Sequence, residues 1–390
     1  MKRMDVIARY VPICDPIGNH KSNRSIEPDG ITISCYENDV PEFIGADMDR
    51  IYGSLYSSLA QFSIYSDSRD TNTYIVRKGG KIITIFLFQC YDCKIRVINE
   101  VISLSEEDIS RFTAYIFINF VSAKVILFTS IQTNIRTLPF PYQCVNNMED
   151  IVLTLPKTGE EYLDSLGKNA RRNIQRYMRN LSETFPSFRF ELLVKDEIDD
   201  QTIRAIIALN RARMDGKNTA SATDQAETEK IIRLAKKCGL VGVARIDGRV
   251  CAGSISFRAG SNYFFRAITH DPMYDAYWIG FLCCYLTFCE CIVREAKELH
   301  FMWGDCEYKY SLPGVKRDLD KVAVYRSNWQ MLRKGDVALK IAFRGCLHQL
   351  MLWSHSAKRR NGLVPQPAIT SLKDLRNMEH RSQAIVAKRK

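Results

Sequence analysis

The sequence contains no apolar run long enough to cross a bilayer. Its most apolar helical stretch, YWIGFLCCYLTFC at residues 277–289, has 13 residues before Glu290 interrupts it, whereas a transmembrane helix needs about 20. The amino terminus is basic but lacks both an uninterrupted apolar segment and a small-residue cleavage site, so we expect no secretory signal. We therefore expect a cytoplasmic protein, with a buried core helix at residues 277–297.

The chain has 13 cysteines, but few of them have the spacing of a recognisable pair. The cysteines are scattered through apolar segments without a disulfide framework, which fits a reducing compartment. Cys90 and Cys93 have the spacing of a metal-binding pair, but no second pair with matching spacing exists in the sequence. We therefore expect no metal.

Acidic residues are absent from residues 168–181. That segment holds five basic residues, Lys168, Arg171, Arg172, Arg176 and Arg179, and residues 356–390 hold nine basic against two acidic residues. These two segments account for the formal net charge of +11. Such localised charge indicates a phosphate-bearing ligand, nucleic acid or an anionic membrane face. The arginines at i, i+4 and i+7 share one face of a predicted helix, which either phosphate or solvent would cover.

Strand and helix patterns alternate along the chain and predict an α+β fold. We predict an irregular segment at residues 1–30, a first unit at 31–150, a second unit at 151–328, and a C-terminal helix with a basic tail at 329–390. Single helices are predicted at residues 48–62 and 158–182. The segments RKGGKIITIFLF and RIDGRVCAGSIS resemble each other in their basic residues, turn and strand. Two copies of one fold, or two unrelated hairpins, would explain this similarity.

Ionisable groups follow directly after a predicted buried strand in HFMWGDCEYKYSLPG, residues 300–314. The candidate site residues in this stretch are Asp305, Glu307, Tyr308, Lys309 and Tyr310. The two acidic residues are two positions apart, so they share one side of an extended segment. Either these groups line a cleft or they form a solvated strand end.

Taken together, LDSLGKNARRNIQRYMRNL, ARIDGRVCAGSISF and WGDCEYKY resemble acyltransferases of the GNAT superfamily. The resemblance is to the cellulose-biosynthesis-associated (CelD-like) family, which is similar to the Fem peptidoglycan-bridge transferases, and it covers residues 153–326. It implies a double GNAT fold in which residues 31–150 are a degenerate copy and residues 151–328 hold the donor, an acyl-CoA.

The resemblance also implies roles for the candidate residues. Tyr308 or Tyr310 would protonate a thiolate leaving group, Lys309 would stabilise negative charge, and Asp305 and Glu307 would hold an amine acceptor or orient Lys309.

On the donor side, the resemblance implies that Lys168, Arg171, Arg172 and Arg176 contact phosphates of the donor or of a nucleotide-linked or lipid-linked acceptor. The pyrophosphate loop corresponds to MYDAYWIGF, in which only Gly280 remains of the glycine pattern. Gly280 would either help a helix N-terminus to bind phosphate or serve close packing. His270 is either a base near the donor carbonyl or a structural residue.

We therefore expect an acyltransferase that moves an acyl group from an acyl-CoA-type thioester to an amine or hydroxyl of an envelope, polysaccharide or lipid-type acceptor. Two alternatives stay open. One is a Fem-like transferase that uses aminoacyl-tRNA, and the other is a catalytically silent GNAT-shaped binding protein associated with polysaccharide synthesis. The basic tail is a candidate for peripheral attachment to an anionic membrane surface.

Overall fold

The computed structural model describes residues 11–12, 22–26, 30–66, 70–215, 223–301 and 314–333, together with residues 339 and 343. Met1–Ile341 forms one compact unit and Ala342–Lys390 a second. The helices and strands described here all lie in the first unit.

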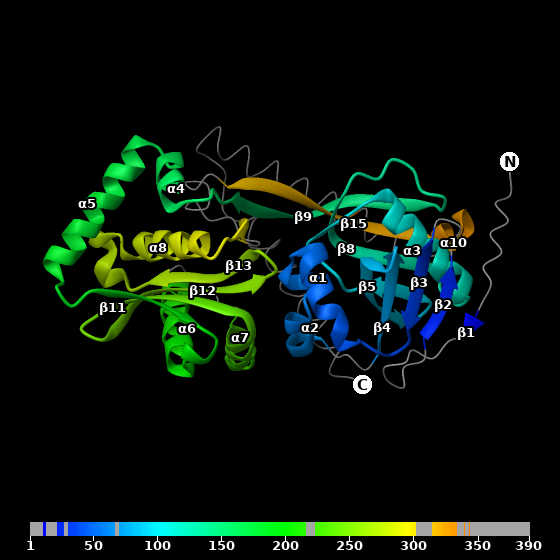
Figure 1. Ribbon diagram of the computed structural model, residues 1–390, viewed down its shortest axis with the longest axis horizontal. Coiled ribbons are helices and arrows are strands. Elements are labelled where there is room, and N and C mark those ends of the chain that lie inside the picture. Colours follow the sequence, from blue (N-terminus) through cyan, green and yellow to red (C-terminus); the bar gives the residue numbers. More distant parts are fainter. Residues whose placement is uncertain are drawn as a thin grey trace. The chain divides into compact units, whose positions relative to one another are not determined.

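One order of elements occurs twice in the first unit (Figure 1). Each copy has a strand, two α-helices, three antiparallel strands, a helix, and a strand parallel to the last of the three. The first repeat consists of β3 (Ile31–Tyr36), α1 (Gly45–Tyr52), α2 (Leu59–Tyr65), β4 (Thr71–Lys78), β5 (Lys81–Tyr91), β6 (Lys94–Val97), α3 (Glu106–Asn119) and β8 (Val125–Thr133). The second repeat consists of β10 (Arg189–Val194), α6 (Asp200–Asp215), α7 (Gln225–Cys238), β11 (Gly239–Ile246), β12 (Arg249–Ala259), β13 (Asn262–His270), α8 (Ile279–Val293) and β14 (Glu298–His300).

The β4–β5 and β11–β12 hairpins correspond in detail. In the first, the pairing register shifts next to Arg77, which leaves Ile83 as the extra residue of a β-bulge. In the second, the register shifts next to Arg245, and Cys251 is the extra residue. The bulge therefore occupies the same place in both hairpins. This agreement confirms that the similar hairpin sequences mark an internal repeat, and it confirms the predicted α+β fold with two tandem copies.

Two long strands, β9 (Tyr142–Thr154) and β15 (Val315–Tyr325), join the repeats into one sheet. β15 pairs with β8 of the first repeat on one side and with β9 on the other, and the end of β9 pairs with β14 of the second repeat. β9 therefore runs through the boundary between the two predicted units at residue 150. The domain boundaries stay predictions.

The remaining elements extend or connect this sheet. They are β1 (Val11–Pro12), β2 (Ser22–Ile26), β7 (Ile102–Leu104), α4 (Gly159–Ser165), α5 (Lys168–Thr184) and α10 (Asn328–Arg333), with 3-10 turns η1 (Glu42–Ile44), η2 (Leu55–Ser57), η3 (Lys195–Glu197) and η4 (Pro272–Tyr277). The helix predicted beyond residue 328 otherwise lies outside the described residues, as does the basic tail.

Helices cover both faces of the sheet in each repeat. In the second repeat, α6 and α7 cover one face and α8 covers the other (Figure 1). In the first repeat, α3 packs its Phe112 ring against Tyr74, Phe86 and Phe128, which are fully buried. Both faces of the central strands are therefore buried.

Two helices that the sequence predicted as continuous are broken, and both predictions were wrong for the same reason. Gly53 ends α1 at φ 51°, after which the chain passes through η2 and begins α2 at the N-cap Ser58. Gly167 separates α4 from α5 at φ 82°. Both glycines adopt backbone angles that disfavour other residues, so each break is set by local conformation rather than by hydrophobic pattern.

A membrane-spanning helix was not expected, and the described part of the chain holds no helix that combines the required length and apolarity. The most apolar helix, α8, has 15 residues and is largely buried between the sheet and α5.

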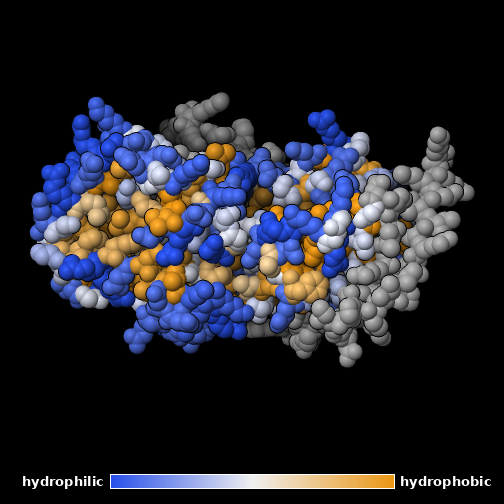
Figure 2. Space-filling view, in the orientation of Figure 1, coloured by the Kyte–Doolittle hydropathy of each residue, from blue (hydrophilic) through white to orange (hydrophobic). Residues whose placement is uncertain are grey.

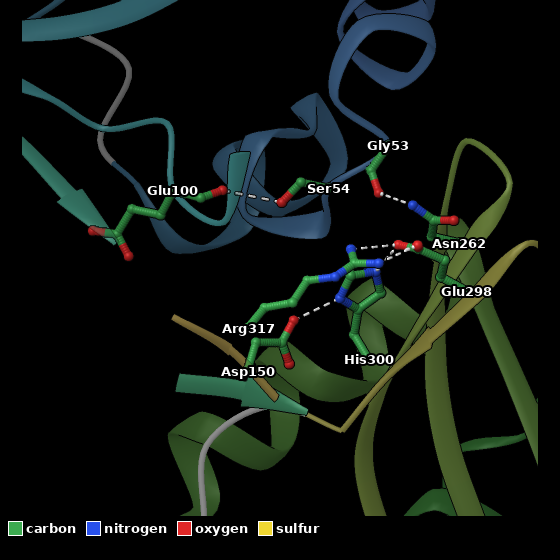
Figure 3. Close-up of polar contacts among 8 residues, drawn as sticks. All are labelled: Gly53, Ser54, Glu100, Asp150, Asn262, Glu298, His300 and Arg317. Carbon is green, nitrogen blue, oxygen red and sulfur yellow. Dashed lines mark hydrogen bonds and ion pairs between the residues drawn. The ribbon is translucent and has the colours of Figure 1, made fainter. Parts of the chain in front are cut away.

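The end of α1 lies against the turn between β12 and β13. A Cβ atom at Gly260, which has φ 59°, would lie 2.6 Å from the carbonyl oxygen of Asp49 and 3.4 Å from Cα of Gly53. Beside it, Nδ2 of Asn262 donates a hydrogen bond to the carbonyl oxygen of Gly53 at 2.9 Å (Figure 3). Two glycines thus let the first repeat approach the second at backbone distance.

We expect Gly260→Ala to lower the free energy of unfolding more than Gly248→Ala does. Both glycines have positive φ, so both substitutions add strain of about 1 kcal/mol, but a Cβ at Gly248 meets no atom within 4 Å. Urea unfolding of the two variants measures the difference, which reports the contact with Asp49. Equal losses of unfolding free energy in the two variants would contradict a close contact between Gly260 and Asp49, because the repeats would then separate easily there.

Candidate active site

The predicted phosphate-binding residues lie on one exposed side of α5. Lys168, Arg171, Arg172 and Arg176 are all exposed, whereas Ile174 and Leu181 on the same helix are buried. Arg171 forms an ion pair with Asp164 at 2.5 Å. Within the described part of the chain, the other three form no ion pair with an acidic side chain. Most of the positive charge of α5 is therefore available to a ligand.

The basic helix packs beside the start of α8. The ring of Tyr177 on α5 stacks on Trp278, the N-cap residue of α8, with centroids 5.2 Å apart and planes 11° apart. Phe185 at the end of α5 meets the edges of Tyr274 and Tyr277 in η4. Trp278 provides no side-chain hydrogen bond to the first amides of α8. Those amides and the nearby arginines are groups that bind anions.

Two candidates on different elements, His270 at the end of β13 and Gly280 in α8, are in contact. A Cβ atom at Gly280 would lie 2.4 Å from Nδ1 of His270, so the imidazole packs directly on the first turn of α8. The other ring nitrogen, Nε2, lies 2.7 Å from Oδ1 of Asp275. These contacts favour the packing role for Gly280 and give His270 a carboxylate partner beside the start of the helix.

The central strand β13 is distorted where it leaves its neighbour. It pairs with β14 only over Asn262–Phe264, and on its other side the register shifts so that Arg266 is the extra residue of a bulge. The guanidinium of Arg266 lies 3.3 Å from Oε1 of Glu227, which also accepts a hydrogen bond from Tyr65 at 3.0 Å. The bulge thus places a charged side chain between α7 and α2.

A buried polar cluster lies on β14, β9 and β15, the three strands that follow β13 in the order of the sheet (Figure 3). Nδ1 of His300 on β14 lies 2.6 Å from Oδ2 of Asp150 on β9, and the two side chains are only 7% and 4% exposed. Nε2 of His300 lies 3.5 Å from Glu298, which receives two hydrogen bonds from Arg317 on β15 at 2.9 and 2.5 Å. Phe264 stacks on the imidazole at 4.2 Å.

The charged groups in this cluster shift one another's pKa values. Burial alone would lower the pKa of His300, but the hydrogen bond to Asp150 and the attraction of Asp150 and Glu298 outweigh burial and raise it. The contact with His300 at 3.5 Å, together with the hydrogen bonds from Arg317, lowers the pKa of Glu298 to about 2 against the opposing effect of burial. The imidazolium of His300 and the carboxylate of Glu298 are therefore favoured in their charged forms.

The predicted catalytic stretch, with Asp305, Glu307, Tyr308, Lys309 and Tyr310, lies outside the described residues. The described chain reaches Phe301 and resumes at Gly314. Sequence reasoning missed the cluster that flanks this stretch. The signal was the alternation of Glu298 and His300 in a strand that is otherwise apolar, because residues two apart share one face.

No group of three or more His, Cys, Asp or Glu residues within the described ranges is arranged to hold a metal ion. The cluster at His300 is instead neutralised internally by Arg317. On the other side of the second repeat, exposed arginines of α5 lie on the helix that packs beside the uncapped start of α8.

Comparisons with known proteins find a matching domain family and similar structures. Residues 168–310 match the model of the acetyltransferase (GNAT) domain family. The FemX crystal structure aligns with a TM-score of 0.55 and 8% identity over 74% of this chain and 97% of that chain. The structure of L-PGS from Bacillus licheniformis aligns at 0.46 and 12% identity over 75% and 93%. A tandem GNAT protein from the clavulanic acid biosynthesis pathway aligns at 0.36 and 11% identity over 75% and 98%. By sequence, no curated protein matches significantly.

The chain therefore contains a GNAT-type acetyltransferase domain and shares the fold of FemX. The second repeat lies inside the matched residues, and the first repeat has the same order of elements. A double GNAT fold, as the sequence resemblance implied, is confirmed. The finer resemblance to cellulose-biosynthesis-associated transferases stays a prediction.

The buried imidazolium predicts a pH-dependent stability. Because the pKa of His300 is raised in the folded state, its contribution is complete below the unfolded pKa of about 6.5 and is lost as the pH rises through the folded pKa. His300→Gln should therefore lose stability relative to wild type at pH 5.5, on the order of 2 kcal/mol, and lose less at pH 9.

Urea unfolding across this pH range measures the effect. His270→Gln is the control, because its ion pair with Asp275 is much more exposed. A loss for His300→Gln that is the same at both pH values would contradict the charged pairing of His300 with Asp150.

Proposed function

We propose that this chain transfers an acyl group from an acyl-CoA-type thioester to an amine or hydroxyl of an envelope, polysaccharide or lipid-type acceptor. The observation that carries the proposal is the meeting of α5 and α8. Exposed arginines on α5 lie beside the uncapped start of α8, within residues that match an acetyltransferase domain. Donor phosphates require this combination of guanidinium groups and free amides.

The chemistry requires few side chains. The acceptor amine or hydroxyl gives up a proton as it attacks the donor carbonyl, the C–S bond breaks, and the leaving thiolate takes up a proton, so that no net proton is released. In the proposed site, a backbone N–H of β13 near its bulge at Arg266 polarises the carbonyl, and the bulge itself supports this assignment. Asp305 and Glu307 hold the acceptor or orient Lys309, and one of Tyr308 and Tyr310 protonates the leaving thiolate.

The His300 cluster supports this arrangement as a positioning device. Glu298 and His300 precede the proposed catalytic stretch, and Arg317 follows it. Their mutual contacts, together with Asp150, hold both ends of the stretch to β9. These ion pairs hold together the described strands that precede and follow the stretch.

A transferase that uses aminoacyl-tRNA is the second candidate, since the exposed arginines of α5 would also bind an RNA backbone. A silent GNAT-shaped binding protein is the third. In the proposal the protein acts in the cytoplasm, and the basic residues 356–390 attach it peripherally to an anionic membrane.

Arg172→Glu together with Arg176→Glu should weaken donor binding at least about tenfold and flatten its salt dependence, because charge-assisted phosphate contacts are lost. Isothermal titration with acyl-CoA at several salt concentrations measures both effects. Lys78→Glu with Lys81→Glu, exposed on the first repeat, is the matched charge control. Unchanged affinity in the folded arginine variant would show that this face of α5 is only solvated.

Lys309→Met should lower turnover of acyl donor by about 100-fold or more with little loss of stability, because it removes a charge that stabilises the transition state. Asp305→Asn should also lower the rate, and the two effects should be non-additive if the residues act together. Tyr308→Phe and Tyr310→Phe should differ, since one hydroxyl serves the leaving group.

Thiol release in single-turnover assays measures these rates. Lys316→Met is the control, because Lys316 pairs with Glu149 on β9 outside the stretch. Wild-type turnover in Lys309→Met and Asp305→Asn, with melting temperatures several degrees lower, would identify the stretch as a structural element.

A further inference from the structure

Trp278 has a backbone conformation that its side chain does not explain. Its φ of 56° and ψ of 30° lie in the left-handed region, which bulky residues rarely adopt because Cβ crowds the following carbonyl. The side chain is 53% exposed, so it contributes little to the core. An outlier of this kind is a reason to look for a function of the exposed ring.

The indole is held in place from one side. Tyr177 stacks on it with nearly parallel planes, and Tyr177 itself packs into the apolar cluster between α5 and α8. The guanidinium of Arg176 lies over the Tyr177 ring, 5.1 Å from its centroid. The result is a fixed aromatic platform with an arginine at its border, rather than a mobile surface tryptophan.

The surroundings of this platform are strongly cationic. Figure 2 shows hydrophilic residues along α5 and apolar residues where α5 and α8 meet. Arg172 stands one turn before Arg176 on α5, and neither forms an ion pair with an acidic residue of the described chain. The nearby carboxylate of Asp275 is engaged by His270 at 2.7 Å. An aromatic face beside unpaired guanidinium groups is the arrangement that binds a nucleotide by stacking and phosphate contacts.

We propose that Trp278 stacks on the base of an adenine nucleotide whose phosphates contact Arg172 and Arg176. The inference rests on the proposed function, because acyl-CoA and aminoacyl-tRNA both carry an adenosine nucleotide. The ligand chemistry that the two donors share is an adenine base with phosphate attached to its ribose.

Adenosine 3′,5′-bisphosphate is the probe, titrated calorimetrically into the full chain. Trp278→Ala and Trp278→Leu should weaken its binding by about tenfold or more, the effect of losing one stacked base, while Trp278→Phe should retain most of the affinity. Trp278→Gly should also lose binding, although glycine suits the left-handed backbone and should raise the melting temperature. Trp329→Leu, at another exposed tryptophan on α10 (64%), is the matched control.

Further probes identify which molecule supplies the nucleotide and how the phosphates contribute to binding. Inorganic pyrophosphate lacks the base, so its binding should fall in the Arg172→Glu variant and not in Trp278→Ala. Coenzyme A and total tRNA, compared on wild type and Trp278→Ala, show which donor occupies the platform. Vesicles that contain phosphatidylglycerol test whether the surface binds lipid instead.

Equal affinity of wild type and Trp278→Ala for the bisphosphate would overturn the proposal, as would no binding to wild type. Loss of vesicle binding in Trp278→Ala without loss of nucleotide binding would also overturn it and would identify a membrane-facing tryptophan. The proposed function is tested separately. If acyl transfer is absent but the bisphosphate binds through Trp278, the function fails and this inference stands.

Discussion

The pairing of β9 with β15 on one side and β14 on the other is the constraint on which the rest of the structure depends. It joins two repeats of the same topology into one sheet. It also brings Asp150, Glu298, His300 and Arg317 together, so that two carboxylates lie against two basic side chains. Removing one partner from such a cluster is costly because it leaves an uncompensated charge. The join between the repeats therefore depends on backbone pairing and on side-chain charge.

The second repeat has different surfaces on its two sides. Toward the first repeat it presents buried ion pairs and close glycine contacts, which fix its position. Around the start of α8 it presents exposed arginines, aromatic rings and amides without a side-chain cap. Rigid support on one side and unneutralised charge on the other are what a site for a phosphate-bearing substrate requires, since the ligand then supplies the missing charge.

The element types and the internal repeat could be predicted from the sequence because strand alternation and turn glycines are local signals. The breaks at Gly53 and Gly167 could not, since a hydrophobic pattern continues through a residue whose backbone angle ends the helix. The basic face of α5 was visible as spacing, but its stacking neighbour Trp278 was not. The pair of Asp150 and His300 joins residues far apart in the sequence, and only the strand order brings them within 2.6 Å. Asp305, Glu307, Tyr308, Lys309 and Tyr310 were chosen because they follow a predicted buried strand, the resemblance implied their roles, and they stay a prediction.

Native mass spectrometry of the freshly purified full chain, with coenzyme A, an acyl-CoA or total tRNA added, tests the central claim most directly. We predict one acyl-CoA retained per chain, with the acyl group lost when a competent acceptor is present. Retention of tRNA that is removed by ribonuclease, without retention of coenzyme A, would contradict the thioester donor. If the chain retained neither donor, the claim that this double GNAT fold is an acyltransferase would be contradicted.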